Sequence, residues 1–109
     1  MDIESLQHPV VKAAISAMQR GDRQAWLDLF ATNAVFTDDG QRQDLVGWSD
    51  RELFGASTGQ LTSVERQKDG GLSLIGSFHS DRWGEFKTFL RFHVQDGKIT
   101  RLDVGQLND

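Results

Sequence analysis

Two adjacent carboxylates, Asp38 and Asp39, end the stretch of this chain that is most informative about chemistry. The stretch from Gly21 to Gly40, GDRQAWLDLFATNAVFTDDG, predicts a short amphipathic helix, a tight turn and a strand over residues 34–38. In that strand Asp38 lies on the same face as the apolar Phe36, and Asp39 falls on the opposite face. A carboxylate that projects from an apolar strand face is partly removed from water. Burial of this kind raises the pKa of the carboxyl group, and a raised pKa suits a general base.

We therefore take Asp38 as the candidate catalytic base and Asp39 as a solvated turn residue. A purely structural role for Asp38 stays open, because Asp-Asp-Gly is also a common turn sequence.

Other kinds of chemistry find little support in the composition. The chain has no cysteine, which excludes thiolate metal sites and cysteine nucleophiles. The three histidines, His8, His79 and His93, have spacings that suit no single helix face, so we expect no metal site. No G-x-G-x-x-G or P-loop pattern occurs, and we expect no cofactor.

The charge balance and hydropathy narrow the class of partner. The 12 lysines and arginines are scattered singly against 16 acidic residues, giving a net charge of -4, so we expect no nucleic-acid partner. No apolar run approaches the length of a membrane span, and the acidic start does not resemble a signal peptide. We expect a single domain over residues 1–109, cytoplasmic and without membrane contact.

Two helices are expected before the strand that carries Asp38. Pro9 suits the first turn of a helix that Gly21 ends, and Asp22 can cap the next helix. In that second helix Ala25, Trp26, Leu29 and Phe30 form one apolar stripe.

After the strand, residues 45–47 read as a brief extended piece. Ser49 followed by Glu52 matches a capping box, which predicts a short helix over residues 49–54. Trp48 and Trp83 are then expected in loops, where an aromatic ring can line a pocket mouth or a dimer seam. Turn signals separate four further strands, at residues 61–67, 72–80, 85–94 and 99–107. Helices followed by a meander predict an α+β fold.

Three segments in this order resemble the NTF2-like superfamily, particularly its SnoaL-like branch, a distant relative of ketosteroid isomerase. They are GD-x3-W-x2-LF-x2-NAVFTDD at 21–39, LVGWSDRELF at 45–54 and TFLRFHVQDGKITRLDV at 88–104. The resemblance implies a cone-shaped, cystatin-like fold in which a curved antiparallel sheet wraps around the N-terminal helices and leaves a pocket open at one end. Members of the superfamily include isomerases, dehydratases, polyketide cyclases, an epoxide hydrolase and proteins without activity.

The resemblance places the general base of ketosteroid isomerase on Asp38. It places that enzyme's two oxyanion donors, a tyrosine and a protonated aspartate, on Ala14 and Thr88, and the chain has no tyrosine at all. Because preorganised donors supply the largest electrostatic contribution to enolate chemistry, steroid isomerisation by that mechanism is not expected.

Strand alternation, set against the family's pocket face, divides the sheet into an inner and an outer face. Arg91, His93, Arg101 and His79 fall on the outer face, which disfavours the Asp–Arg–Asp and histidine–acid sets of the hydrolase and dehydratase branches. With Ser80 as a further polar group, the residues expected to form the pocket are Ala14, Met18, Phe36, Trp48, Phe54, Phe78, Phe86, Thr88, Leu90, Leu102 and Gln106.

Two functions follow from this inventory and remain open. The first is a cofactor-free isomerase, dehydratase or hydrolase that acts on a small apolar molecule with Asp38 as base. The second is a non-catalytic module that binds a small ligand or dimerises. In either case the mixed aromatic and polar outer face, with Ile75, Phe89, Arg91 and His93, suits a homodimer interface.

Overall fold

The computed structural model describes residues 1–55 and 58–107. In chain order its helices and strands are α1 (Pro9–Gln19), α2 (Arg23–Asp28), β1 (Phe30–Asp38), β2 (Gln41–Gln43), α3 (Leu45–Glu52), β3 (Gly59–Lys68), β4 (Ser73–Ser80), β5 (Gly84–Gln95) and β6 (Lys98–Gln106). Two 3₁₀ turns, Ile3–Ser5 and Asp69–Gly71, complete the chain order. The predicted α+β class is confirmed.

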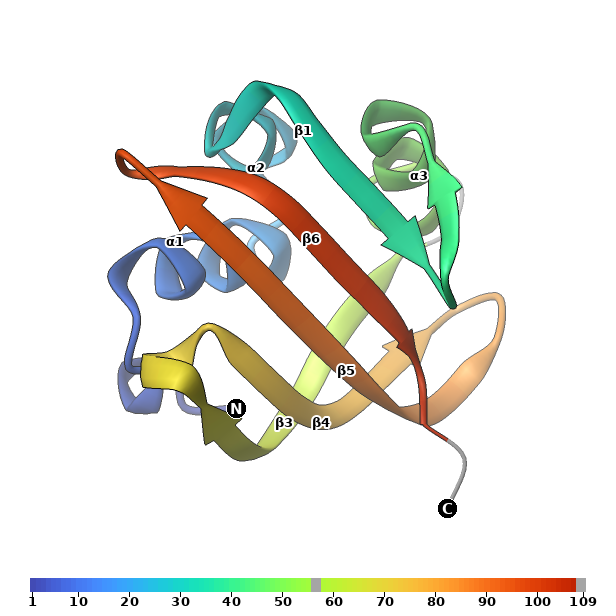
Figure 1. Ribbon diagram of the computed structural model, residues 1–109. Helices are drawn as coiled ribbons and strands as arrows, with labels where there is room; N and C mark the ends of the chain where they lie inside the picture. The colour runs from blue at the N-terminus through green and yellow to red at the C-terminus, as the bar shows by residue number, and fades with distance from the viewer. Residues whose placement is uncertain (56–57, 108–109) are drawn as a thin grey trace.

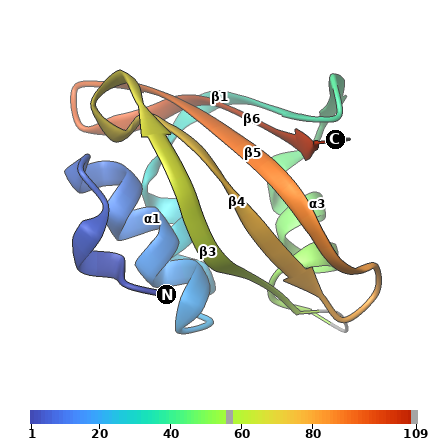
Figure 2. The same cartoon turned by 90° about the horizontal axis from the view of Figure 1, so that it is seen from below.

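The strands form one curved sheet in the order β2-β1-β6-β5-β4-β3. Figures 1 and 2 show the helices gathered on the concave side of this sheet, with α1 and α3 toward opposite ends. The hairpin-connected strands β3 to β6 pair antiparallel, as predicted, whereas β1 pairs parallel with β6. The sheet is therefore mixed rather than purely antiparallel, because β1 runs in the same direction as β6.

The first two helices begin and end where capping chemistry places them. Pro9 stands in the first turn of α1, and Gly21 follows the helix with a φ of 70°. The Asp22 side chain accepts the Ala25 amide at 3.1 Å and caps α2. The prediction that Phe30 belongs to the second helix is wrong, because α2 ends at Asp28. The Ile99 amide donates to the Leu29 carbonyl at 2.8 Å, and from Phe30 onward the chain belongs to the sheet.

The third helix differs from its prediction. The Asp44 carboxylate accepts the Gly47 amide at 2.9 Å, so α3 begins at Leu45, and residues 45–47 are helical rather than extended. Ser49 is not a cap: it is fully buried, and its hydroxyl accepts the Trp26 indole N–H at 3.0 Å. Trp48 consequently lies on a helix and not in a loop. This rigid attachment of α3 to α2 fixes the side chains that α3 carries toward the sheet.

The core lies between the concave sheet face and the helices. Its largest fully buried apolar side chains are Trp26, Phe36, Ile15, Leu61, Leu74, Ile99, Leu102 and Val11. The predicted strands are present at shifted boundaries, and β2 is an additional short strand that pairs with the end of β1. Within residues 1–55 and 58–107, no helix combines the length and the apolar character needed to cross a bilayer.

Candidate functional site

A cavity of about 560 Å³ lies where β1 ends, between α3 and the β4–β5 turn. Its apolar wall comes from one side chain on each of α1 and α2, one on α3, and several on the three central strands. The apolar and aromatic lining residues are Met18, Trp26, Trp48, Phe78, Trp83, Phe86, Leu90, Leu102 and Val104, of which Trp83 lies in the β4–β5 turn. The volume falls within the range of small-molecule sites in proteins.

Asp38, at the last position of β1, lines this cavity. The indole N–H of Trp48 donates to its Oδ2 at 2.9 Å, and the Trp48 ring packs on Phe36 with ring centroids 4.5 Å apart. Burial raises the pKa of Asp38 above its ordinary value; the Trp48 hydrogen bond opposes this, and the neighbouring Asp39 and Glu52 charges add to it. The arrangement gives a half-buried carboxylate with a single neutral donor.

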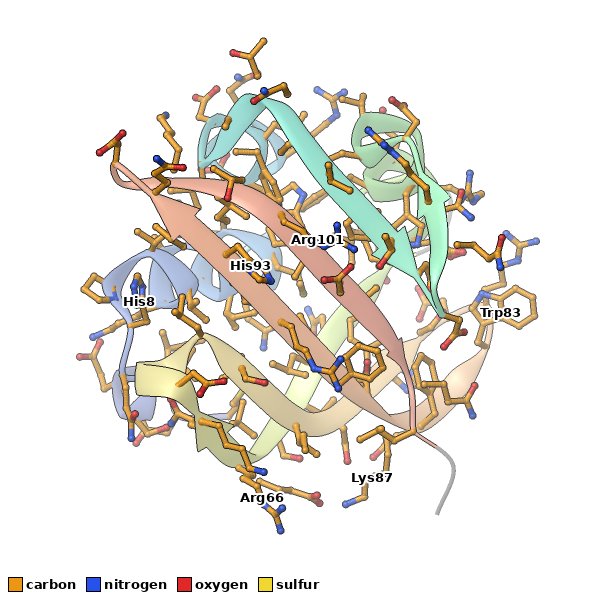
Figure 3. All side chains as sticks on the ribbon, in the orientation of Figure 1. His8, Arg66, Trp83, Lys87, His93 and Arg101 are labelled. Atoms are coloured by element: carbon orange, nitrogen blue, oxygen red, sulfur yellow. The ribbon has the colours of Figure 1, made fainter. Side chains whose placement is uncertain are left out.

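The cavity mouth is charged. Glu52, on α3 one helical turn after Trp48, accepts the Trp83 indole N–H at 3.3 Å. Arg82 and Arg51 approach the same Glu52 oxygen at 3.8 and 4.0 Å. Figure 3 shows Trp83 projecting from the β4–β5 turn at the edge of the molecule, and its side chain is 64% exposed. The mouth is thus closed on one side by contacts between that turn and α3.

Asp39 joins the ends of two strands at the cavity rim. It is exposed, adopts a φ of 50°, and its Oδ1 accepts the Gln106 amide at 2.9 Å. Its own amide donates to the Val104 carbonyl at 2.9 Å. Asp39 is therefore an exposed turn residue, as the sequence predicts, and it also lines the cavity.

The neutral polar groups of the lining are mostly engaged with backbone. The Thr88 hydroxyl donates to the Gly105 carbonyl at 2.7 Å. The Ser80 Oγ accepts the amides of Arg82 and Trp83, each at 3.1 Å. Gln106 is exposed at the rim. No pair of these groups forms a preorganised oxyanion hole comparable with the one that ketosteroid isomerase chemistry requires.

Most of the residues expected in the pocket line the cavity: Asp38, Met18, Trp48, Phe78, Ser80, Phe86, Thr88, Leu90, Leu102 and Gln106. Three lie outside the lining. Ala14 is fully buried on α1, Phe36 packs beneath Trp48, and Phe54 contacts Trp26 with ring centroids 6.4 Å apart. The lining residues that were not expected are Trp26, Asp39, Arg51, Glu52, Arg82, Glu85, Val104 and Gly105, and Trp83, expected at a pocket mouth or a dimer seam, also lines the cavity.

The outer face of the sheet carries the charged residues that strand alternation assigned to it. Figure 3 shows His93 and Arg101 on the face toward the viewer, opposite to the helices. Arg101 pairs with Asp103 at 2.9 Å, and Arg91 lies over the Phe89 ring at 4.5 Å. Across the described part of the chain, no group of three histidine or acidic side chains is placed to hold a metal ion.

Comparisons with known proteins support the fold. No family model matches the sequence, and no curated protein matches it significantly. A candidate polyketide cyclase from Xanthomonas campestris pv. campestris is similar with a TM-score of 0.69 and 18% identity, over 97% of this chain and 93% of that chain. A candidate ketosteroid isomerase from Kribbella flavida gives a TM-score of 0.72 and 14% identity, over 95% and 79%. An NTF2-like protein of unknown function from Cytophaga hutchinsonii gives 0.64 and 13%, over 87% and 84%.

At these identities the matches establish the architecture alone. They confirm the predicted fold, which this chain shares with a solved NTF2-like protein.

Proposed function

We propose that this protein binds a small, mostly apolar molecule in the cavity and acts on it as a cofactor-free isomerase, dehydratase or hydrolase. In this proposal Asp38 is the general base, and the ligand body lies against the apolar wall. Thr88, Ser80 and Gln106 orient the ligand at the polar end. The matched structures described as a candidate cyclase and a candidate isomerase use the same architecture, which is consistent with small-molecule chemistry.

One observation carries the proposal: a half-buried carboxylate stands at the end of β1 inside a cavity of about 560 Å³. Burial raises the pKa of Asp38, and a carboxylate whose pKa is raised toward neutrality is a more effective proton acceptor. Trp48 fixes the orientation of the carboxylate through one oxygen, at 2.9 Å, and leaves the other oxygen for a ligand.

A second candidate function is binding without catalysis. It is favoured by the Thr88 hydroxyl, which donates to the Gly105 carbonyl and so leaves the cavity few donors to stabilise a developing negative charge. The two candidates differ in one respect, since only the first requires proton transfer through Asp38.

We also propose that two copies pair through the outer face of the sheet. On that face Arg91 covers the Phe89 ring at 4.5 Å, beside the half-buried Ile75, which gives the mixed aromatic and polar character common at interfaces. Sedimentation at micromolar concentration is expected to give a dimer, and an Ile75→Glu variant is expected to be monomeric with unchanged ligand binding. A monomeric wild type would reject this pairing.

The ligand site is tested with a panel of small carbonyl compounds, epoxides and alcohols that includes amine-bearing members. Wild-type protein is expected to gain thermal stability with at least one compound and, if the enzyme proposal holds, to convert it. Asp38→Asn is expected to keep the fold and lose turnover. Asp96→Asn, a matched change at the β5–β6 turn, is expected to keep both the fold and the turnover. Turnover that survives in Asp38→Asn would remove Asp38 as the base and favour another group.

A further inference from the structure

The cavity wall carries more negative than positive charge. Four carboxylates line it, against two guanidinium groups: Asp38, Asp39, Glu52 and Glu85 against Arg51 and Arg82. This excess of two negative charges is concentrated in the lining of one cavity, whose other residues are mostly apolar or aromatic. An apolar wall strengthens the field of the charges that it holds.

Both arginines pair with Glu52 rather than with Asp38 or Asp39, and the Arg51 charge, which lowers the pKa of Asp38, is the smallest of the influences on it. Both approach Glu52, at 3.8 and 4.0 Å. Asp38 instead receives the neutral Trp48 indole N–H, and Asp39 receives a backbone amide. Asp38 and Asp39 thus face the cavity with neutral donors, and the charge of Asp39 raises the pKa of Asp38.

Aromatic rings surround the same space. Five aromatic side chains line the cavity: Trp26, Trp48, Phe78, Trp83 and Phe86. One of these rings already accepts a cation, since the Arg82 guanidinium lies 4.8 Å from the centroid of Trp83. Aromatic faces attract ammonium and guanidinium groups, and most strongly where water is excluded.

From this combination we propose that the ligand of the cavity is a small organic cation, an amine or quaternary ammonium with an apolar body. Its positive group lies at the rim beside Asp38 and Asp39, and its body lies on the inner wall formed by Met18, Leu90 and Leu102. The inference rests on the proposed function, because it names the ligand class of the same cavity.

A cation in this position also favours the ionised form of Asp38. It offsets the burial and the like charges that raise the pKa of Asp38, so the carboxylate stays charged and pairs with the ligand while the ligand is bound. Neither a neutral nor an anionic ligand has this effect.

The test compares three probes of matched shape that differ in charge: phenylbutylamine, phenylbutanol and phenylbutyrate. Calorimetry at neutral pH and low salt is expected to rank the amine about tenfold tighter than the alcohol, with the carboxylate weakest. Asp39→Asn keeps an acceptor for the Gln106 amide and tolerates the positive φ, so it removes charge with little other change. This variant is expected to bind the amine roughly two- to fivefold more weakly than the wild type does and to bind the alcohol with unchanged affinity.

Glu65→Gln is the control for long-range charge. Glu65 pairs with Lys87 away from the cavity, and this variant is expected to bind all three probes as the wild type does. An alcohol that binds as tightly as the amine would overturn the cation inference and leave the proposed function standing. Failure of all three probes, and of matched aliphatic triplets, would contradict both.

Discussion

Replacement of Asp38 by asparagine is expected to stabilise the folded protein at neutral pH while abolishing the proposed chemistry. Asparagine keeps the shape of the side chain and an oxygen that accepts the Trp48 indole N–H, which now lies 2.9 Å from Oδ2. What the substitution removes is a charge that burial disfavours and that Asp39 and Glu52 repel.

The sign follows from the raised pKa of Asp38. A group whose pKa is higher in the folded state stabilises that state fully below its unfolded pKa, and this contribution is lost as the pH rises through the folded pKa. As the pH rises, the wild type loses this contribution of Asp38 to stability. Asparagine does not titrate, so the stability of the variant does not fall in the same way. Because Asp38 is only half-buried, solvent screening holds the gain below about 1 kcal/mol, or about 4 °C in Tm for a chain of this size.

Urea unfolding of wild type and Asp38→Asn across a series of pH values measures this difference. The gain is expected to be largest at neutral pH and to shrink as the pH falls through the folded pKa of Asp38. Asp96→Asn at the β5–β6 turn is the matched control and is expected to show no such trend. A variant that is less stable than wild type at neutral pH, or a gain that grows in acid, would refute the reasoning.

Three further substitutions test how the elements around the site are held. Ser49→Ala leaves the buried Trp26 indole N–H without its 3.0 Å acceptor and is expected to cost about 1–3 kcal/mol in urea unfolding; a neutral result would contradict the buried bond. Asp44→Ala removes the cap that accepts the Gly47 amide and is expected to cost about 1 kcal/mol, with unchanged stability arguing against a helix start at Leu45. Gly76→Ala would place a Cβ 2.0 Å from a β3 carbonyl oxygen and is expected to lower stability by at least about 2 kcal/mol; wild-type Tm would show that the strands are further apart.

Local signals in the sequence were sufficient for most of the elements. Proline at a helix start, glycine after a helix end, and Asp-Gly or Gly-Gly turns each act over a few residues, and the helices and hairpins they mark are present. The start of α3 was missed because both Asp44 and Ser49 are valid caps by type, and only the burial of Ser49 against Trp26 decides between them. The parallel pairing of β1 with β6 joins distant segments, and no local pattern encodes it.

The candidate site was predictable on its apolar side and at Asp38, since strand alternation assigns side chains to faces. The charged mouth of the cavity could not be predicted, because charged residues in a helix or a turn ordinarily face solvent. One signal was present: Glu52 follows Trp48 by four residues, so a helix that begins at Leu45 places both on one face. Arg82 reaches the cavity from the β4–β5 turn, whose path sequence does not determine, and Glu85 reaches it from the start of β5.

The indole N–H groups offer the most direct test that the cavity is a ligand site. The chain has three tryptophans, and all three line the cavity: Trp26 donates to Ser49, Trp48 to Asp38 and Trp83 to Glu52. In a ¹H–¹⁵N spectrum recorded while a ligand panel is titrated, a ligand is expected to shift the Trp48 signal most, and Asp38→Asn is expected to change that response. A panel that leaves all three indole signals unmoved would contradict a small-molecule site built around Asp38.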